Sequence, residues 1–365
     1  MTNPYRGLPD HCFWNRAMSW PAPGRIDPVV SGIQIGPDDK VATMGSCFAQ
    51  HLARHIKTLG LNYHVTERAP DWMTPDQASA SNYGVFSARY GNVYTVRQAL
   101  QMFYRAFGIF HPGGDIWARG DGFVDAFRPQ IEPVPFASVD EVQESRRLHL
   151  GYVRDVFTQS SWIVFTLGLT EAWQSRHDGS IYPVAPGVSG GDYNTNDYAF
   201  VNFGFNDVAG DLRELIRRIG DVNPGCKILL TVSPVPLIAT YEPQHVLVST
   251  TYSKAVLRAV AGEIANAARN VHYFPSYEII TSPASGGGYY EDDLRQVTDL
   301  GVRHVMRLFT EHYVNKPICE EPEQMPARTE RPVEAEPPRY PNAVVCDEEA
   351  IERSLKEHGF VPQTP

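Results

Sequence analysis

Short apolar runs that alternate with helical stretches constrain the fold of this chain more than any other feature. Residues 41–44, 162–167 and 227–232 are rich in β-branched, aliphatic and aromatic side chains and do not alternate between polar and apolar. Such runs are typical of strands buried on both faces. Strands that alternate with helices favour a parallel sheet with helices on both faces. We expect an α/β protein, a three-layer α/β/α sandwich with a mainly parallel sheet.

Helical periodicity is clearest directly after the first run. Phe48, Leu52 and Ile56 repeat every four residues, which predicts a strand, a tight turn at Gly45-Ser46 and a helix. A last strand is expected near residues 271–274. Further helices are expected over residues 95–107, 139–158, 207–219, 252–268 and 299–312.

Composition divides the chain into four segments. Residues 1–38, rich in proline, glycine and aromatic residues, predict an extended arm on the surface of an α/β domain at residues 39–315. Residues 316–345 are rich in proline and glutamate, which favours an extended linker. Residues 346–365 regain some amphipathicity and predict a short docking segment.

Charge and cysteine content exclude several classes of protein. Hydrophobic residues make up 42% and charged residues 20%, as in ordinary globular proteins. A net charge of −10 argues against a nucleic-acid partner. Five scattered cysteines form no disulfide or zinc pattern, and no cofactor motif is present, so we expect no metal and no cofactor. Without a signal peptide or a long apolar run, we expect a cytoplasmic chain with no membrane span. The sequence does not set the oligomeric state.

A serine lies at the junction of the first strand and its helix. Ser46 projects from a sharp bend, and the N-terminus of the following helix offers backbone N–H groups that can stabilise an oxyanion. The alternative role for this serine is helix capping. Cys47 is a competing nucleophile, because a helix N-terminus lowers the pKa of a thiol.

The stretch Gly45-Ser46-Cys47-Phe48-Ala49 resembles the signature of the GSCFA family. The resemblance extends over about residues 30–312 and includes residues 81–84, 166–168 and 231–235. It implies the flavodoxin-like α/β/α fold of SGNH/GDSL-type hydrolases, with Ser46 as the nucleophile. Related enzymes often remove or transfer acyl groups on carbohydrates.

The resemblance also implies an oxyanion site. SGNH enzymes hold the oxyanion with the N–H of the serine, a glycine in a second block and an asparagine in a third. The second block falls on residues 82–84 or on residues 91–92, and the third on residues 168–171, which lack the asparagine. Turn chemistry is the alternative role for each candidate. The candidates are Gly45, Cys47, Asn82, Gly84, Asn92, Gly168, Thr170 and Asn202.

The base expected in the last SGNH block, of the form Asp-x-x-His, is missing. The block implies Asp293 as the aspartate and places Gln296 at the histidine, and glutamine accepts no proton near neutral pH. Three explanations are open: His245 supplies the base from another loop, Asp293 acts directly at a cost of about 10²–10⁴-fold, or the site binds without catalysis. For His304, in the closing helix, a helix-surface role is favoured.

Two further patterns have ordinary interpretations. His51 and His55 have the i, i+4 spacing of a zinc site, but no carboxylate of the metalloprotease pattern lies between them, so a polar helix face is favoured. Aromatic residues near the predicted loops offer a platform for a sugar ring, although aromatics also fill cores. They are Tyr83, Tyr90, Trp173, Tyr182, Tyr289 and Tyr290.

Two functions follow from these patterns. The first is a serine-dependent O-acyl esterase or acyltransferase that acts on a carbohydrate or glycan ester, with Ser46, Asp293 and His245 as catalytic residues. The alternative is a weak or inactive module on the same fold that binds an acylated sugar or a protein partner. The Gly45-Ser46 turn favours the first and Gln296 favours the second.

Overall fold

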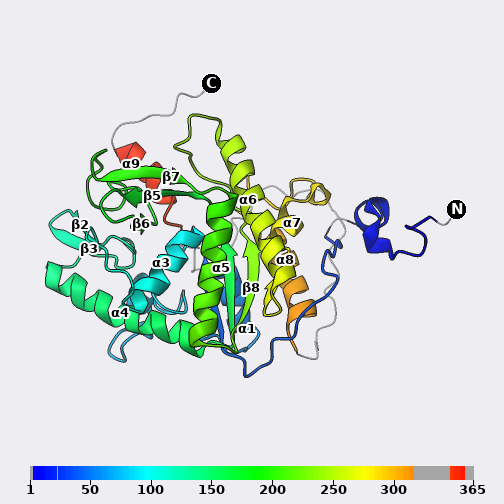
Figure 1. The fold of residues 1–365 in the computed structure, drawn as a ribbon, viewed down its shortest axis with the longest axis horizontal. Helices are drawn as coiled ribbons and strands as arrows, with labels where there is room; N and C mark the ends of the chain where they lie inside the picture. Colours follow the sequence, from blue (N-terminus) through cyan, green and yellow to red (C-terminus); the bar gives the residue numbers. More distant parts are fainter. Residues whose placement is uncertain (1–2, 23, 316–345, 358–365) are drawn as a thin grey trace, which may run out of the picture.

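The central sheet consists of four parallel strands in the order β1–β4–β8–β9 (Figure 1). Our computed structural model describes residues 3–22, 24–315 and 346–357. The strands are β1 (Val41–Gly45), β4 (Trp162–Leu167), β8 (Lys227–Val232) and β9 (Val271–Tyr273). Nearly every side chain in β1, β4 and β8 is buried, as their apolar runs predict.

Helices cover both faces of this sheet. One face packs against α3 (Val96–Ala106), α4 (Val139–Gln159), α5 (Phe205–Val222) and α6 (Val246–Ala267). The other packs against α1 (Ala49–Thr58), α7 (Ser276–Thr281) and α8 (Asp299–Tyr313). The prediction of an α/β protein with a parallel sheet flanked by helices is therefore confirmed.

Smaller elements surround the edge of the sheet at which its strands end. A three-stranded antiparallel sheet has the order β6–β5–β7, and β2 pairs with β3 in a hairpin. Their bounds are β2 (Ile116–Arg119), β3 (Gly122–Asp125), β5 (Glu171–Ser175), β6 (Ile181–Tyr182) and β7 (Tyr198–Asn202). The remaining short helices are α2 (Pro75–Ala80) and the turns Asp10–Cys12, Asn15–Ser19 and Pro283–Ser285.

Both terminal regions contact the α/β domain. Ile35 is fully buried and its N–H donates to the carbonyl of Tyr313, so part of the predicted arm is built into the domain. The predicted linker at residues 316–345 lies outside the described residues. Helix α9 (Glu349–Glu357) follows three residues that pack against the domain. Within the described ranges, no helix is long and apolar enough to span a bilayer.

Candidate active site

Ser46 lies between the end of β1 and the start of α1, at the carboxyl edge of the sheet. Gly45 has φ +131°, and a Cβ there would collide with the carbonyl of Thr166. The N–H of Ser46 donates to that carbonyl at 3.1 Å. The side chain is 4% exposed, and its Oγ has no hydrogen-bond partner among the residues that the structure describes. A buried hydroxyl without a partner is unfavourable and often marks a functional position.

Gly168, directly after β4, backs the serine. A Cβ at this glycine would lie 3.1 Å from Ser46 Cβ and 2.9 Å from the carbonyl oxygen of Tyr94. The Gly168 N–H donates to the same Tyr94 oxygen at 3.1 Å. Only a glycine therefore lets the two loops close around Ser46.

A buried lysine completes this side of the site. Lys254 Nζ, on α6, donates to the carbonyl of Gly168 at 2.6 Å, and the residue is 3% exposed. Burial lowers the pKa of Lys254 to about 8, while nearby Glu348 and Cys47 act in the opposite direction. We did not predict Lys254 from the sequence. The available signal is a lysine on the same buried helix face as Leu257 and Ile264.

The loop that carries Asn92 also packs against the serine turn. The N–H of the next residue, Val93, donates to the carbonyl of Gly45 at 2.8 Å, which holds this loop against the turn. Gln50 Nε2 donates to Asn92 Oδ1 at 3.2 Å, and Asn92 Nδ2 donates to Asp347 Oδ2 at 2.9 Å. The structure thus brings Asn92, Gly168 and the residues around Ser46 together.

Residues 346–348, which we call the C-terminal segment, enter the same site. The side chain of Cys47 interacts with that of Cys346, and this interaction together with burial raises the pKa of Cys47 well above its ordinary value. The interaction with Cys47, opposed by burial and aided by Arg295, lowers the pKa of Cys346 to about 5. Cys47 is therefore held as a thiol, which disfavours it as the nucleophile.

The carboxylates of the segment are held by polar groups of the domain. Arg295 Nη2 donates to Glu348 Oε2 at 2.7 Å, and the hydroxyl of Tyr94 accepts the N–H of Asp347 at 3.1 Å. Burial, and next the neighbouring Cys346, raise the pKa of Glu348 to about 7. Burial raises the pKa of Asp347 to about 6, although Asn92 acts against it. Three acidic groups, the Cys346 thiol and the two carboxyl groups, therefore share one desolvated site with the cations of Arg295 and Lys254.

The other predicted oxyanion donors have partners away from Ser46. Asn82 Nδ2 lies 3.3 Å from the carbonyl of Ile131, and the carbonyl of Gly84 accepts from Lys57. The hydroxyl of Thr170 donates to Asn202 Oδ1 at 2.7 Å, so these two candidates pair with each other.

The predicted acid–base residues are placed at turns. His245 is exposed and caps α6, where its Nδ1 accepts the N–H of Leu247 at 3.1 Å. Asp293 Oδ1 accepts the N–H groups of Arg295 and Gln296 at 2.8 and 2.9 Å. Neither side chain is hydrogen-bonded to Ser46 in the described structure. Both ring nitrogens of the buried His304 have partners, Tyr289 and the carbonyl of Ile26, so its expected helix-surface role is wrong.

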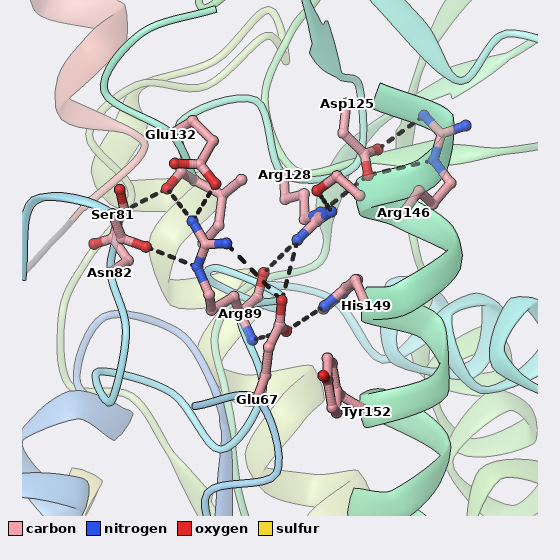
Figure 2. Close-up of polar contacts among 12 residues, drawn as sticks. Glu67, Ser81, Asn82, Arg89, Asp125, Arg128, Glu132, Arg146, His149 and Tyr152 are labelled. Atoms are coloured by element: carbon pink, nitrogen blue, oxygen red, sulfur yellow. Dashed lines mark hydrogen bonds and ion pairs between the residues drawn. The ribbon is translucent and has the colours of Figure 1, made fainter. Parts of the chain in front are cut away.

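A buried ionic network supports the loop that carries Asn92 (Figure 2). Glu67 accepts from the N–H of Arg89 at 2.7 Å and from His149 Nδ1 at 2.7 Å, and Arg128 bonds Asp125 at 3.0 Å. Burial lowers the pKa of His149 to about 4, so the ring is neutral at pH 7. Burial alone would raise the pKa of Glu67, but His149, Arg128 and the Arg89 N–H lower it to about 2. The network joins this loop to α4 and to β3.

Of the predicted aromatic platform, only Trp173 belongs to a partly exposed cluster. Its ring contacts those of Tyr241, Tyr193 and Phe200 at centroid distances of 4.8, 5.1 and 6.0 Å. Tyr241 is 60% exposed. Three of the other candidates, Tyr90, Tyr182 and Tyr289, are buried. Tyr193, Phe200 and Tyr241 lie on separate segments, so the sequence gives no local sign of the cluster.

Comparison with known proteins places the residues around Ser46 inside a known family domain. A search of the curated proteins found no match to this chain. The model of the GSCFA family matches residues 40–309, which include β1, Ser46, Gly168, Lys254 and Arg295. This match covers well over half of the sequence and confirms the resemblance found in the signature. The chain belongs to the GSCFA family.

Proposed function

We propose that this protein is a serine-dependent O-acyl esterase or acyltransferase of the SGNH type, with Ser46 as its nucleophile. The observation that carries the proposal is the buried Ser46 hydroxyl, which has no partner in the described residues and lies at a strand-to-helix turn. Structural serines in such positions usually cap the helix or bond to a neighbouring carbonyl. A nucleophile instead keeps its hydroxyl unpaired with structural groups, so that a general base can take its proton.

Stabilisation of the oxyanion falls to groups beside Ser46 in this proposal. The Ser46 N–H already donates to Thr166, so the adjacent Cys47 N–H and the Asn92 amide are the favoured donors. Such donors act through their fixed orientation and are typically worth about 10²–10³ in rate. In this proposal, the Asn92 amide donates to substrate in place of its present bond to Asp347.

The proton of Ser46 has three candidate acceptors. His245 and Asp293 follow from the sequence, and Lys254 forms part of the wall of the site. A lysine with a pKa near 8 has a substantial neutral fraction at slightly alkaline pH and can then act as a base. His245 and Asp293 need a loop movement to reach Ser46.

A glycan ester is the proposed substrate. The cluster around Trp173 supports this choice, because exposed aromatic rings stack on sugar rings through their apolar faces. Trp173 is five residues from Gly168, so their Cα atoms lie within about 18 Å of each other, and Gly168 packs against Ser46.

The test is active-site labelling. The wild-type protein and Ser46→Ala would be treated with a fluorophosphonate probe and assayed with p-nitrophenyl acetate, with Ser285→Ala as a serine control outside the site. We expect labelling and turnover in the wild type and in the control, and neither in Ser46→Ala. Absence of both in all three proteins would refute the esterase.

A second candidate function is a binding module on the same fold. Gln296 at the expected histidine and the 4% exposure of Ser46 favour it. Its signature is a rise in melting temperature with an acetylated oligosaccharide, and no covalent labelling of Ser46.

A further inference from the structure

Residues 346–348 follow the last helix of the family domain by more than thirty positions, yet they fill the space beside its candidate nucleophile. Cys346 and Asp347 are each 6% exposed. Their partners come from three separate parts of the domain: Cys47 on the serine turn, Asn92 on its neighbouring loop, and Arg295 before α8. The contacts are therefore those of a ligand in a site.

The domain side of these contacts is cationic. Arg295 forms an ion pair with Glu348 at 2.7 Å, and each side chain is 12% exposed. Lys254 is buried close enough to Glu348 for the two charges to interact. Without the segment, both cations would face the site with no acidic side chain of residues 346–348 beside them. Desolvated cations without a counter-charge are costly, so an open site favours an incoming anion.

Ser46 is nearly inaccessible in this structure, and Cys346 interacts with the residue next to it, Cys47. At 4% exposure its hydroxyl cannot meet an ester from solution, so substrate must displace a part of the structure that covers it. The C-terminal segment is held by polar contacts to side chains rather than by membership in the sheet, which makes it the part that can leave.

We propose that the site beside Ser46 is a carboxylate-recognition site, in which Arg295 and Lys254 bind an acidic group of the substrate, and that residues 346–348 occupy it as an internal ligand. This inference rests on the proposed function for the identity of the substrate as an ester. The binding site itself does not depend on that function. The favoured substrate is an acyl ester that carries a carboxylate close to the ester bond.

The pair Cys47 and Cys346 reports whether the segment is bound. Their side chains interact while the segment is bound, so an oxidant can join them in a disulfide in this arrangement. With diamide as the oxidant, the Cys346 thiolate adds to the N=N bond, and Cys47 then attacks the Cys346 sulfur. The S–S bond forms, and the two electrons and two protons leave on the reduced hydrazine. Peptide mapping separates this bridge from reactions of the exposed Cys12.

The first experiment measures the rate of this disulfide in the full-length protein with glutarate, and with uncharged glutaramide at the same ionic strength. We expect the bridge to form quickly, glutarate to slow it about tenfold at saturation, and glutaramide to leave it unchanged. Arg295→Gln should abolish the effect of glutarate. A bridge that never forms, or one that forms equally fast with glutarate, would overturn the proposal.

The second experiment measures fluorophosphonate labelling of Ser46 in Glu348→Gln. Loss of the charged hydrogen bond to Arg295 should release the segment more often and raise the labelling rate about tenfold. A slower labelling rate would mean that Glu348 helps Ser46 to react instead of blocking access to it, and would overturn the proposal. If Ser46 is unlabelled in every variant, the esterase function fails, while the disulfide rates still decide the carboxylate site. Thermal melting of Glu348→Gln checks that it is folded.

Discussion

Lys254 Nζ lies 2.6 Å from the carbonyl oxygen of Gly168, so helix α6 is tied to the glycine that backs Ser46. The bond is charge-assisted and almost completely shielded from water, which makes it stronger than an average hydrogen bond. It links the position of a helix to the shape of the serine turn. Changes at either end should therefore affect both stability and the reactivity of Ser46.

Substitution of the lysine tests that link. Lys254→Met should lower the free energy of unfolding by about 1–3 kcal/mol, because the Gly168 carbonyl loses its buried partner. Lys254→Gln keeps a hydrogen-bond donor without the charge, so its free energy of unfolding should fall by less than that of Lys254→Met. Urea unfolding of the three proteins checks this order. Equal stability of Lys254→Met and the wild type would show that the bond adds nothing.

The contact between Gly168 and Ser46 predicts a steric effect. Gly168→Ala places a Cβ 3.1 Å from Ser46 Cβ and 2.9 Å from the Tyr94 carbonyl, so we expect a loss of about 1–3 kcal/mol and slower labelling of Ser46. Gly151→Ala is the matched control, because its Cβ on α4 would meet nothing within 4 Å. That variant should gain about 0.5–1 kcal/mol from helix propensity. Similar results for the two alanines would contradict the close packing.

His245 provides a test of the base. His245→Asn retains a capping side chain on α6 but removes the imidazole. From the structure, we expect the labelling rate of Ser46 to stay close to that of the wild type. A fall of about 10²-fold with unchanged stability would instead assign general-base catalysis to His245. The same assay of Asp293→Asn tests whether Asp293 acts as the general base.

The buried ionic network predicts how stability depends on pH. Burial lowers the pKa of His149 from 6.5 to about 4, so below pH 6.5 the unfolded chain binds a proton that the folded protein excludes. The contribution of His149 to stability should therefore fall as pH drops from 6.5 toward 4. Asp347 and Glu348, whose pKa values are raised to about 6 and 7, act in the opposite direction in this range, so the His149 contribution is measured as the difference between the wild type and a His149 variant. The pKa of Glu67 is lowered from 4.5 to about 2, so this carboxylate adds a second loss of stability as pH falls from 4.5 toward 2.

Urea midpoints at pH 8, 6.5, 5 and 4 check this dependence. In His149→Gln the loss between pH 6.5 and 4.5 should shrink. The loss below 4.5 should shrink only in part, because Arg128 and the Arg89 N–H still lower the pKa of Glu67. The same pH dependence in the wild type and in His149→Gln between pH 6.5 and 4.5 would show that the imidazole is charged in the folded state.

The sequence predicted the central sheet well because its strands are apolar on both faces. Trp162–Leu167 and Lys227–Val232 are found at their predicted bounds. Helix α6 begins at Val246, six residues before the predicted start, because His245 caps it. We did not predict the small sheet of β5, β6 and β7, whose short strands mix polar with apolar residues and depend on pairing between distant segments.

The candidate site was less predictable than the fold. Ser46 and Gly168 were found because each follows a buried strand, and a parallel sheet brings such positions to one edge. Lys254 is the ninth residue of α6, and its position on the buried face with Leu257 and Ile264 is a weak signal, because a lysine in a helix is usually on the surface. Cys346 and Glu348 reach the site across more than 250 positions from Cys47 and Asn92, a distance at which local patterns carry no information.

The late position of the C-terminal segment also matters for biosynthesis. Cys47, Asn92, Lys254 and Arg295 all leave the ribosome before residues 346–348 are made, and chains generally fold from the N-terminal side as they emerge. Each new molecule therefore has a period in which the domain is assembled but the C-terminal segment has not yet bound to the proposed cationic site. During that period a carboxylate from the surroundings meets no competitor, so newly made chains are the population most exposed to an outside ligand.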